Sequence, residues 1–283
     1  NKVLKVTLKS LKDSFIQGLK QNYSSSEAEQ LFYMAIDHLW TLSRTDYLRD
    51  SGKEWEKDTS GLHRIVLRLL QHEPIQYIIG ETLFYGLRIK LNRHTLIPRP
   101  ETEELMERIK NSDLQPETIL DAGSGSGCIA LALKRIFPAA HCTGVDISEG
   151  ALQLAHQNAV LNGLEVSFRQ MDILKSENLQ QSFDLIVSNP PYVAEAEKEN
   201  MSAGVTDHEP YTALFVPDAD PLVFYRMIEK IADKKLNPGG RIFLEINQRF
   251  GPETAALFSS GPWQQVILHQ DLSGNDRFLE VWK

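Results

Sequence analysis

The spacing of apolar residues divides the chain into two parts with different periods. Up to about residue 75, apolar side chains recur every three or four positions, first at Leu4, Leu8, Leu11, Phe15 and Leu19. This period places apolar side chains on one face of a helix. Serines at 24–26 supply a cap for a second helix, and Pro74 closes another that covers 62–70. The pattern predicts a small all-helical domain over residues 1–75.

From residue 118 onward, short apolar runs of strand length alternate with helical patterns. Strands are expected at 118–122, 141–146, 166–171, 183–187, 241–246, 265–269 and 278–282. Helices are expected at 128–137, 149–161 and 221–235, the last ended by Asn237, Pro238, Gly239 and Gly240. Alternation of this kind predicts parallel strands with helices on both faces. We therefore expect a doubly wound α/β sheet, within a second domain over residues 101–283.

Residues 76–100 connect the two parts. Alternating apolar residues on either side of Gly86 predict a β-hairpin over 82–91. Pro98 and Pro100 then hold the chain extended, and Pro100 with the acidic residues after it suits the first turn of a helix that reaches about Lys110. This rigid stretch is compatible with a wall of an active site and equally with a plain linker.

Composition restricts the classes of protein that remain. The chain has 283 residues, 42% of them hydrophobic, and a formal net charge of −8, which disfavours a non-specific polyanion binder. A long apolar span and a charged-then-apolar leader are both absent from the sequence, so a cytoplasmic protein is expected. Cys128 and Cys142 lie in apolar segments, which favours reduced thiols, and the histidines lack ligand spacing, so we expect no metal.

A glycine loop follows the first strand of the second part. Glycines at 123, 125 and 127 let the backbone approach a ligand at the carboxyl end of that strand, where open α/β sheets bind ligands. A dinucleotide fingerprint would require glycine where Cys128 stands, and no Gly-Lys-Ser/Thr sequence follows, so pyrophosphate binding is disfavoured. Asp146 ends the second strand, where a carboxylate can accept both ribose hydroxyls of a nucleoside.

The sequence Asn-Pro-Pro-Tyr at 189–192 ends the strand predicted at 183–187. Because Pro190 and Pro191 lack N–H groups, this loop offers mainly oxygens that accept hydrogen bonds. A planar NH2 group suits it as a ligand, since the group has two hydrogens to donate and a flat face on which Tyr192 can stack. A proline-rich turn with a packing tyrosine is the alternative interpretation of this motif taken alone.

On these motifs the chain resembles the class I S-adenosylmethionine-dependent methyltransferases, and within them the release factor glutamine methyltransferases (the HemK family). Matching stretches lie at 73–80, 96–103, 121–127, 188–192, 209–210 and 271–277. Asn-Pro-Pro-Tyr is shared with adenine and guanine amino-methyltransferases, whereas the block at 98–103 points to this family. Asn247 stands where the family usually has glycine, and residues 215–220 replace a more glycine-rich stretch.

The resemblance implies a Rossmann-like sheet of seven strands, mostly parallel, and a set of site residues. Contacts to S-adenosylmethionine are implied for Asp121, Gly123, Ser124, Gly125, Ser126, Gly127, Asp146, Ile147, Asp172, Ile173 and Asn189. Contacts to a substrate glutamine are implied for Asn189, Pro190, Pro191, Tyr192, Arg99 and Glu101. Asn189, Pro190 and Tyr192 are expected to serve catalysis, because acceptors there stabilise N–H groups that become more acidic during transfer.

The activity implied is methylation of the glutamine side-chain amide in the Gly-Gly-Gln motif of class I peptide chain release factors, with S-adenosylhomocysteine as product. The helical domain is expected to dock the release factor. We expect a monomer that binds neither nucleic acid nor a membrane. One alternative is an adenine or guanine amino-methyltransferase, against which the nearly balanced charge of residues 1–75 argues. The other is a cofactor-binding module without activity, against which the intact sequence at 189–192 argues.

Overall fold

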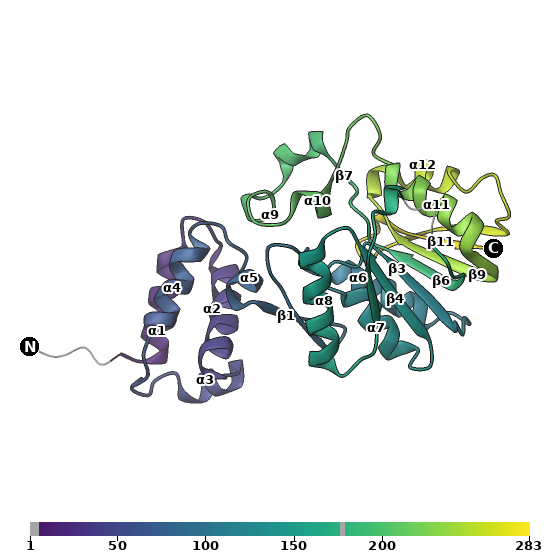
Figure 1. Ribbon diagram of the computed structural model, residues 1–283. Coiled ribbons are helices and arrows are strands. Elements are labelled where there is room, and N and C mark those ends of the chain that lie inside the picture. Colours follow the sequence, from purple (N-terminus) through teal and green to yellow (C-terminus); the bar gives the residue numbers. More distant parts are fainter. Residues whose placement is uncertain (1–5, 176–178) are drawn as a thin grey trace, which may run out of the picture. The chain divides into compact units, whose positions relative to one another are not determined.

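The chain divides into two compact units, seen along the sequence in Figure 1. The structure is a computed structural model that describes residues 6–175 and 179–283. Of the described residues, the first unit comprises 6–80 and 202–208, and the second comprises 81–175, 179–201 and 209–283. Within the described residues, no helix combines the length and the apolar character needed to cross a membrane.

The first unit is helical. Its elements are α1 (Leu8–Leu19), α2 (Ser25–Trp40), α3 (Arg44–Asp50), α4 (Ser60–Leu69), α5 (Ile75–Ile79) and the short α9 (Ala203–Thr206). The expected start of the first helix at Leu4 falls outside the described residues. Ser24 caps α2 as predicted, since its hydroxyl accepts from Glu27 N at 3.2 Å while the Glu27 carboxylate accepts from Ser24 N at 2.9 Å.

Aromatic side chains form the centre of this unit. Phe32 is fully buried, and its ring makes edge contacts with Phe15 at 5.5 Å and Tyr47 at 5.7 Å between centroids. Three helices therefore meet at one residue, because Phe15, Phe32 and Tyr47 come from α1, α2 and α3. Residues 202–208 join the unit from far along the chain, and the His208 ring contacts Gln71 O at 3.0 Å.

The second unit begins with the predicted hairpin, whose strands are β1 (Glu81–Phe84) and β2 (Leu87–Lys90). Its two turn residues, Tyr85 and Gly86, both have positive φ, 50° and 71°. This conformation matches the twist of a two-residue hairpin. The Asn158 amide holds the hairpin to the main fold, because its Oδ1 accepts from Lys90 N at 2.8 Å and its Nδ2 donates to Lys90 O at 3.1 Å.

A seven-stranded sheet forms the centre of the second unit and confirms the predicted fold class. Its strands are β3 (Thr118–Ala122), β4 (His141–Asp146), β5 (Ser167–Gln170), β6 (Phe183–Ser188), β9 (Leu236–Glu245), β10 (Gln265–Gln270) and β11 (Asp276–Trp282). The strand order is β10-β11-β9-β6-β3-β4-β5. β11 is antiparallel to both of its neighbours, and the remaining pairs are parallel.

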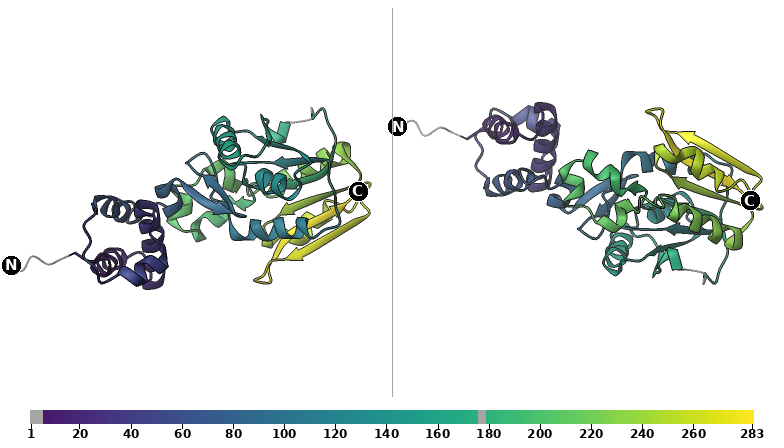
Figure 2. Two further views of the ribbon diagram at one scale, coloured as in Figure 1. Left: turned by 90° about the horizontal axis from the view of Figure 1, so that it is seen from below. Right: turned by 90° about the horizontal axis from the view of Figure 1, so that it is seen from above.

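Helices cover both faces of this sheet (Figures 1 and 2). One face carries α6 (Pro100–Lys110), α7 (Cys128–Ile136) and α8 (Glu149–Asn162), and the other carries α11 (Val223–Lys235) and α12 (Gly251–Ala256). Tyr225 and Ile228 of α11 pack against Ile242 and Leu279 of the sheet. Cys128 and Cys142 are buried free thiols.

The strand β9 begins earlier than predicted. The turn residues at 237–240 do end α11, but Leu236 already pairs with Phe183 of β6. The next parallel pair is Leu185 with Arg241, so the residues between them form a bulge. Proline at 238 cannot donate to the ladder and Gly239 has φ 78°, which explains why regular pairing is interrupted there.

Short elements close the carboxyl end of the sheet. They are η1 (Ile173–Lys175), β7 (Val193–Ala194), η2 (Glu195–Asn200), α10 (Tyr211–Leu214), β8 (Phe215–Val216) and η3 (Gln248–Phe250). β7 and β8 form a small parallel pair, in which Val193 faces Phe215. The chain that leaves β6 is thereby tied to the segment that precedes α11.

Candidate active site

The glycine loop between β3 and α7 adopts a conformation that favours glycine. Gly123, Gly125 and Gly127 have φ of 81°, 53° and 81°. A Cβ at Gly127 would lie 2.9 Å from the Phe168 ring, whereas the space beside Gly123 and Gly125 is open. Glycine is therefore needed at 127 for packing, and at the other two positions it gives the loop an exposed backbone that a ligand can approach.

Asp121 lies beneath this loop and is fully buried. Its Oδ2 accepts hydrogen bonds from Ser124 Oγ at 2.6 Å and from Ala130 N at 3.1 Å. Its Oδ1 is buried without a hydrogen-bond partner among the described residues. Burial raises the pKa of this carboxyl to about 7. Asp121 thus supports the shape of the loop from below, at an electrostatic cost once it is ionised.

Asp146 ends β4 beside the same loop. Its Oδ2 accepts from Gly125 N at 2.8 Å, and its Oδ1 accepts from Ser148 N at 2.9 Å. Burial raises the pKa of this carboxyl, and these two backbone bonds act in the opposite direction. The carboxylate is therefore held rigidly, and each oxygen keeps a further lone pair for a ligand.

The Asn-Pro-Pro-Tyr loop leaves the sheet where β6 ends. Ser188 Oγ donates to Ala122 O at 2.5 Å and fastens this strand end to β3. Asn189 Nδ2 donates to Thr102 Oγ1 on α6 at 3.3 Å. Because the amide is planar, its Oδ1 points away from Thr102. Pro190 is buried. Because prolines have a fixed φ and no N–H group, the loop is both rigid and short of donors, as the sequence predicted.

The Tyr192 side chain turns toward the sheet. Its hydroxyl donates to Glu245 Oε1 at 3.0 Å, and its ring packs against the core of the second unit. Burial raises the pKa of Glu245, while the hydrogen bonds from Thr102 and Tyr192 lower it. Asn247 fixes the loop from the other side, because its Nδ2 donates to Tyr192 O and to Glu197 Oε1, both at 3.0 Å.

Arg99 holds the extended segment before α6 in place. Its Nη2 lies 2.5 Å from Glu209 Oε1, and Ile97 N donates to Glu209 Oε2 at 3.2 Å. Glu209 is buried, and each of its two oxygens accepts one of these bonds. The carboxylate therefore joins two segments that are far apart in sequence. The stretch around Pro98 is thus a fixed wall of the second unit rather than a free linker.

These elements surround one cavity of about 410 Å³, a volume within the range of small-molecule sites. Of the predicted residues, the cavity is lined by Arg99, Gly123, Ser124, Gly125, Ser126, Asp146, Ile147, Asp172, Ile173, Asn189, Pro190 and Pro191. Four predicted residues do not line it, namely Asp121, Gly127, Tyr192 and Glu101. Asp121, Gly127 and Tyr192 instead support the loops described above.

Other lining residues were missed from the sequence. They include His94, Leu96, Thr102, Met171, Tyr211, Phe215, Pro217, Val223 and Phe224. Thr102, Val223 and Phe224 lie on predicted helices, whereas His94, Leu96, Met171 and Pro217 lie outside helices and strands, where neither a period of 2 nor one of 3.6 indicates which side chain faces inward. The matching Glu209-Pro210 pair was the available signal that the segment including Tyr211 belongs to the site.

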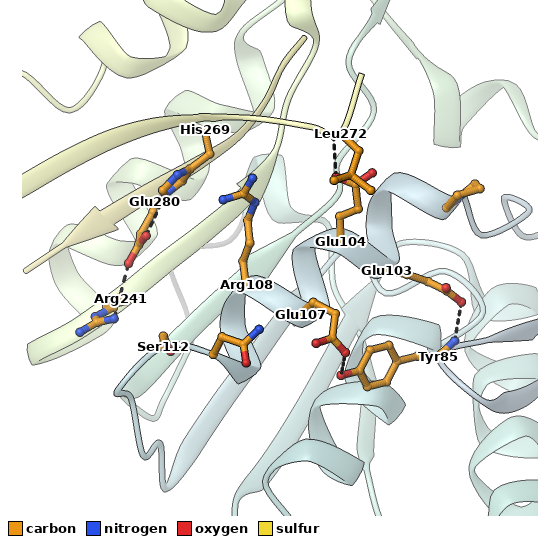
Figure 3. Close-up of a pocket in the computed structure, with 12 residues that line it drawn as sticks. Tyr85, Glu103, Glu104, Glu107, Arg108, Ser112, Arg241, His269, Leu272 and Glu280 are labelled. Carbon is orange, nitrogen blue, oxygen red and sulfur yellow. Dashed lines mark hydrogen bonds and ion pairs between the residues drawn. The ribbon is translucent and has the colours of Figure 1, made fainter. Parts of the chain in front are cut away.

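A larger hollow of about 840 Å³ lies elsewhere on the second unit, beside α6 and the edge formed by β9, β10 and β11. Figure 3 shows that its carboxylates already have partners within the fold. Glu103 accepts from Tyr85 N at 2.6 Å, Glu107 from Tyr85 Oη at 2.5 Å, and Glu104 from Leu272 N at 3.0 Å. These contacts hold the hairpins to α6, so we do not assign this hollow as the active site.

Comparison with known proteins finds a family model for each of two stretches of the chain. Residues 13–80 match the family described as PrmC N-terminal domain, and residues 100–205 match Methyltransferase small domain. A crystal structure of a methyltransferase from Pyrococcus furiosus shares the fold, with a TM-score of 0.52 and 19% identity over 79% of this chain and 98% of that chain.

Curated relatives match nearly the whole chain. A release factor glutamine methyltransferase of Flavobacterium psychrophilum is 40% identical over 97% of this chain and 98% of its own length. One of Bacteroides thetaiotaomicron is 43% identical over 93% and 95%, respectively. One of Streptococcus pneumoniae is 38% identical over 90% and 91%. The family expected from the sequence motifs is confirmed: this chain belongs to the release factor glutamine methyltransferases.

Proposed function

We propose that this protein transfers a methyl group from S-adenosylmethionine to the side-chain amide nitrogen of the glutamine in the Gly-Gly-Gln motif of class I peptide chain release factors. The observation that carries the proposal is a single cavity lined by both the glycine loop with Asp146 and the Asn189 loop. The relatives named for this activity cover nearly the same length. Because release factors act in translation, we place the reaction in the cytoplasm.

The glycine-loop side of the cavity fits the cofactor. The space beside Gly123 and Gly125 is open to a ligand that packs on the backbone. Asp146 can accept the ribose hydroxyls with the lone pairs that Gly125 N and Ser148 N leave free. Asp172 and Ile173 line the same cavity after β5 and would flank the adenine. When bound, S-adenosylmethionine would supply a sulfonium methyl group. A C–N bond to the glutamine nitrogen would form as the C–S bond breaks, S-adenosylhomocysteine would leave, and the nitrogen would lose one proton.

The Asn189 side of the cavity fits the substrate amide. A carboxamide nitrogen is a poor nucleophile, so placement in line with the methyl group is the main requirement. Asn189 Oδ1 and the Pro190 carbonyl can each accept one of its two N–H groups. These acceptors gain strength as the nitrogen becomes positive during transfer, because its N–H groups become more acidic. The loop thus positions the nucleophile and stabilises the transition state with the same two oxygens.

Mass spectrometry of a purified release factor after incubation with the enzyme and the cofactor tests this function. We expect one added methyl group on the Gly-Gly-Gln glutamine, and none on a release factor in which that glutamine is alanine. We expect no methylation of DNA or RNA oligonucleotides, since a net charge of −8 disfavours binding to a polyanion. We also expect the monomer to catalyse this methylation without a second copy of the chain. Methylated adenine or guanine with an unmodified release factor would disprove the proposal.

Replacing Asp146 tests the cofactor assignment. We expect Asp146→Ala to weaken binding of S-adenosylhomocysteine about ten- to a hundredfold, because hydrogen bonds to a charged group contribute roughly 1.5 to 3 kcal/mol. Asp146→Asn keeps one acceptor oxygen and should bind with intermediate affinity. Titration calorimetry on folded variants measures both. Wild-type affinity in Asp146→Ala would show that the ribose lies elsewhere.

The first unit is proposed to dock the release factor, and its exposed leucines provide a test. Leu48 on α3 is 65% exposed and Leu67 on α4 is 49% exposed, although both are large apolar side chains. We expect Leu48→Ser with Leu67→Ser to raise the KM for intact release factor about tenfold, because buried apolar contacts would be lost. The KM for a short Gly-Gly-Gln peptide should stay near that of the wild type.

A matched control is Val160→Ser on α8 of the second unit, where the side chain is 83% exposed. This variant should leave the KM for both substrates unchanged. Steady-state kinetics with the two substrates decide the matter. An unchanged KM for intact release factor in the double leucine variant would remove these side chains from the docking surface.

A further inference from the structure

A chain of hydrogen bonds runs from the Asn189 side chain into the sheet. Asn189 Nδ2 donates to Thr102 Oγ1 at 3.3 Å, and Thr102 Oγ1 donates to Glu245 Oε2 at 2.6 Å. The other carboxylate oxygen, Glu245 Oε1, accepts from Tyr192 Oη at 3.0 Å. Three elements distant in sequence, α6, the loop after β6 and the end of β9, therefore meet at one carboxylate. We call the first two bonds the Thr102–Glu245 relay.

Burial excludes water from these bonds, and the Glu245 carboxylate, which can only accept while it is ionised, sets their directions. Thr102 is 2% exposed and Glu245 is 1% exposed, so water does not compete for their polar atoms. A threonine hydroxyl has one proton, and in the relay that proton is committed to Glu245 Oε2. Toward Asn189, Thr102 Oγ1 is left with lone pairs and can only accept. The relay therefore selects the NH2 end of the Asn189 amide rather than its oxygen.

The choice of amide orientation matters for the proposed reaction. The two ends of an asparagine amide have nearly the same size, so packing alone does not distinguish them. In the observed orientation Oδ1 points away from Thr102 and can accept from a substrate N–H. In the reversed orientation, an NH2 group would face the substrate NH2 group, and two donors would oppose each other. A residue that prevents this reversal would raise the fraction of productive complexes.

We propose that Thr102 and Glu245 are positioning residues, which hold the Asn189 carboxamide with its oxygen toward the substrate nitrogen. This inference rests on the proposed function and adds two residues to its site. Neither residue reacts: Thr102 acts through Asn189, and Glu245 acts through Thr102. The 3.3 Å bond to Asn189 is long, so its contribution is the direction it imposes rather than a large gain in binding energy.

The closing experiment combines Thr102→Val with Asn189→Ala. Valine keeps the volume of threonine and removes the hydroxyl. We expect Thr102→Val to lower the single-turnover rate with saturating cofactor about tenfold. A change of this size is typical of the interaction energy between two residues in contact. Thr102→Ser restores the hydroxyl and should recover most of the rate. In the Asn189→Ala background, Thr102→Val should change the rate by less than about twofold, because the amide that it orients is absent.

Two kinetic results would overturn the proposal. One is an equal rate loss from Thr102→Val in both backgrounds, which would indicate a general structural effect. The other is a wild-type rate in Thr102→Val. Calorimetry with S-adenosylhomocysteine reports whether the variants keep a folded cavity. If Thr102 only positions Asn189, this affinity should stay near that of the wild type.

A readout without activity separates this inference from the proposed function. The side-chain NH2 resonances of Asn189 are identified in 15N spectra by their loss in Asn189→Ala. They should shift in Thr102→Val and stay in place in Thr102→Ser. Unshifted resonances in Thr102→Val would overturn the positioning role. A wild-type enzyme that leaves release factor unmethylated would overturn the proposed function, while these resonances would still decide whether the relay orients Asn189.

Discussion

Asn189→Ala is expected to lower the single-turnover rate of methyl transfer about 10²- to 10³-fold, the usual cost of losing one preorganised group that stabilises a transition state. The reason is the placement of the amide: Nδ2 is engaged with Thr102 Oγ1 at 3.3 Å, which leaves Oδ1 to face the cavity. Alanine removes that acceptor from a nitrogen that gains positive charge during transfer. The rate should fall even when cofactor and peptide are saturating.

Rapid-quench measurement of a single turnover separates this chemical step from binding. Asn189→Asp is the informative companion, because it keeps an acceptor oxygen in the cavity but cannot donate to Thr102. We expect partial activity, above that of alanine and below that of the wild type. If Asn189→Ala raises only the KM and leaves the single-turnover rate unchanged, Asn189 binds the substrate without stabilising the transition state.

Asp121→Asn is expected to remove a large part of the pH dependence of stability in the cofactor-free protein. The Asp121 carboxyl has an ordinary pKa near 3.9 when unfolded, and burial raises its pKa in the fold to about 7. Between these values the unfolded state is ionised while the folded state stays protonated. The folded state then binds more protons, so this group lowers the free energy of unfolding as pH rises to about 7, by on the order of 4 kcal/mol.

Chemical denaturation of wild type and Asp121→Asn at pH 5 and pH 8 measures this effect. The wild type should lose about 2 to 3 kcal/mol more than the variant over that interval. Asp46→Asn serves as a control, because hydrogen bonds from Ser43 lower the pKa of the Asp46 carboxyl, so this group is ionised in both states between pH 5 and pH 8 and its loss should leave the pH profile unchanged. Parallel pH profiles for wild type and Asp121→Asn would show that Asp121 does not titrate in this range.

The sequence alone determined which parts of the chain form helices and which form the strands of the sheet. Periods of 3.6 and 2 depend on local side-chain order, so they predicted the helices of the first unit and the strands of the second. Glycine and proline positions fixed two loops for the same local reason: positive φ at Gly123 and the missing N–H at Pro190 are properties of single residues. These loops follow β3 and β6, which are neighbours in the sheet, so motifs predicted separately share one cavity.

The bulge in β9 was missed because strand pairing depends on a partner. Leu236 belongs to the strand only through its pairing with Phe183 of β6, which local pattern does not reveal. The same holds for residues 202–208, which lie within the second half of the chain yet belong to the first compact unit. Local preference names an element, but contacts between distant segments set its ends and its neighbours.

The roles of individual side chains likewise depend partly on the local sequence and partly on the tertiary structure. The sequence predicted Tyr192 as a residue of the site, but only the tertiary structure turned its hydroxyl to Glu245, at the end of a strand more than fifty positions away. Thr102 looked like an ordinary residue in the first turn of α6 until the fold placed it between Asn189 and Glu245. Residue types and loop chemistry are encoded locally, whereas the direction of a buried hydrogen bond depends on which distant acceptor takes the proton.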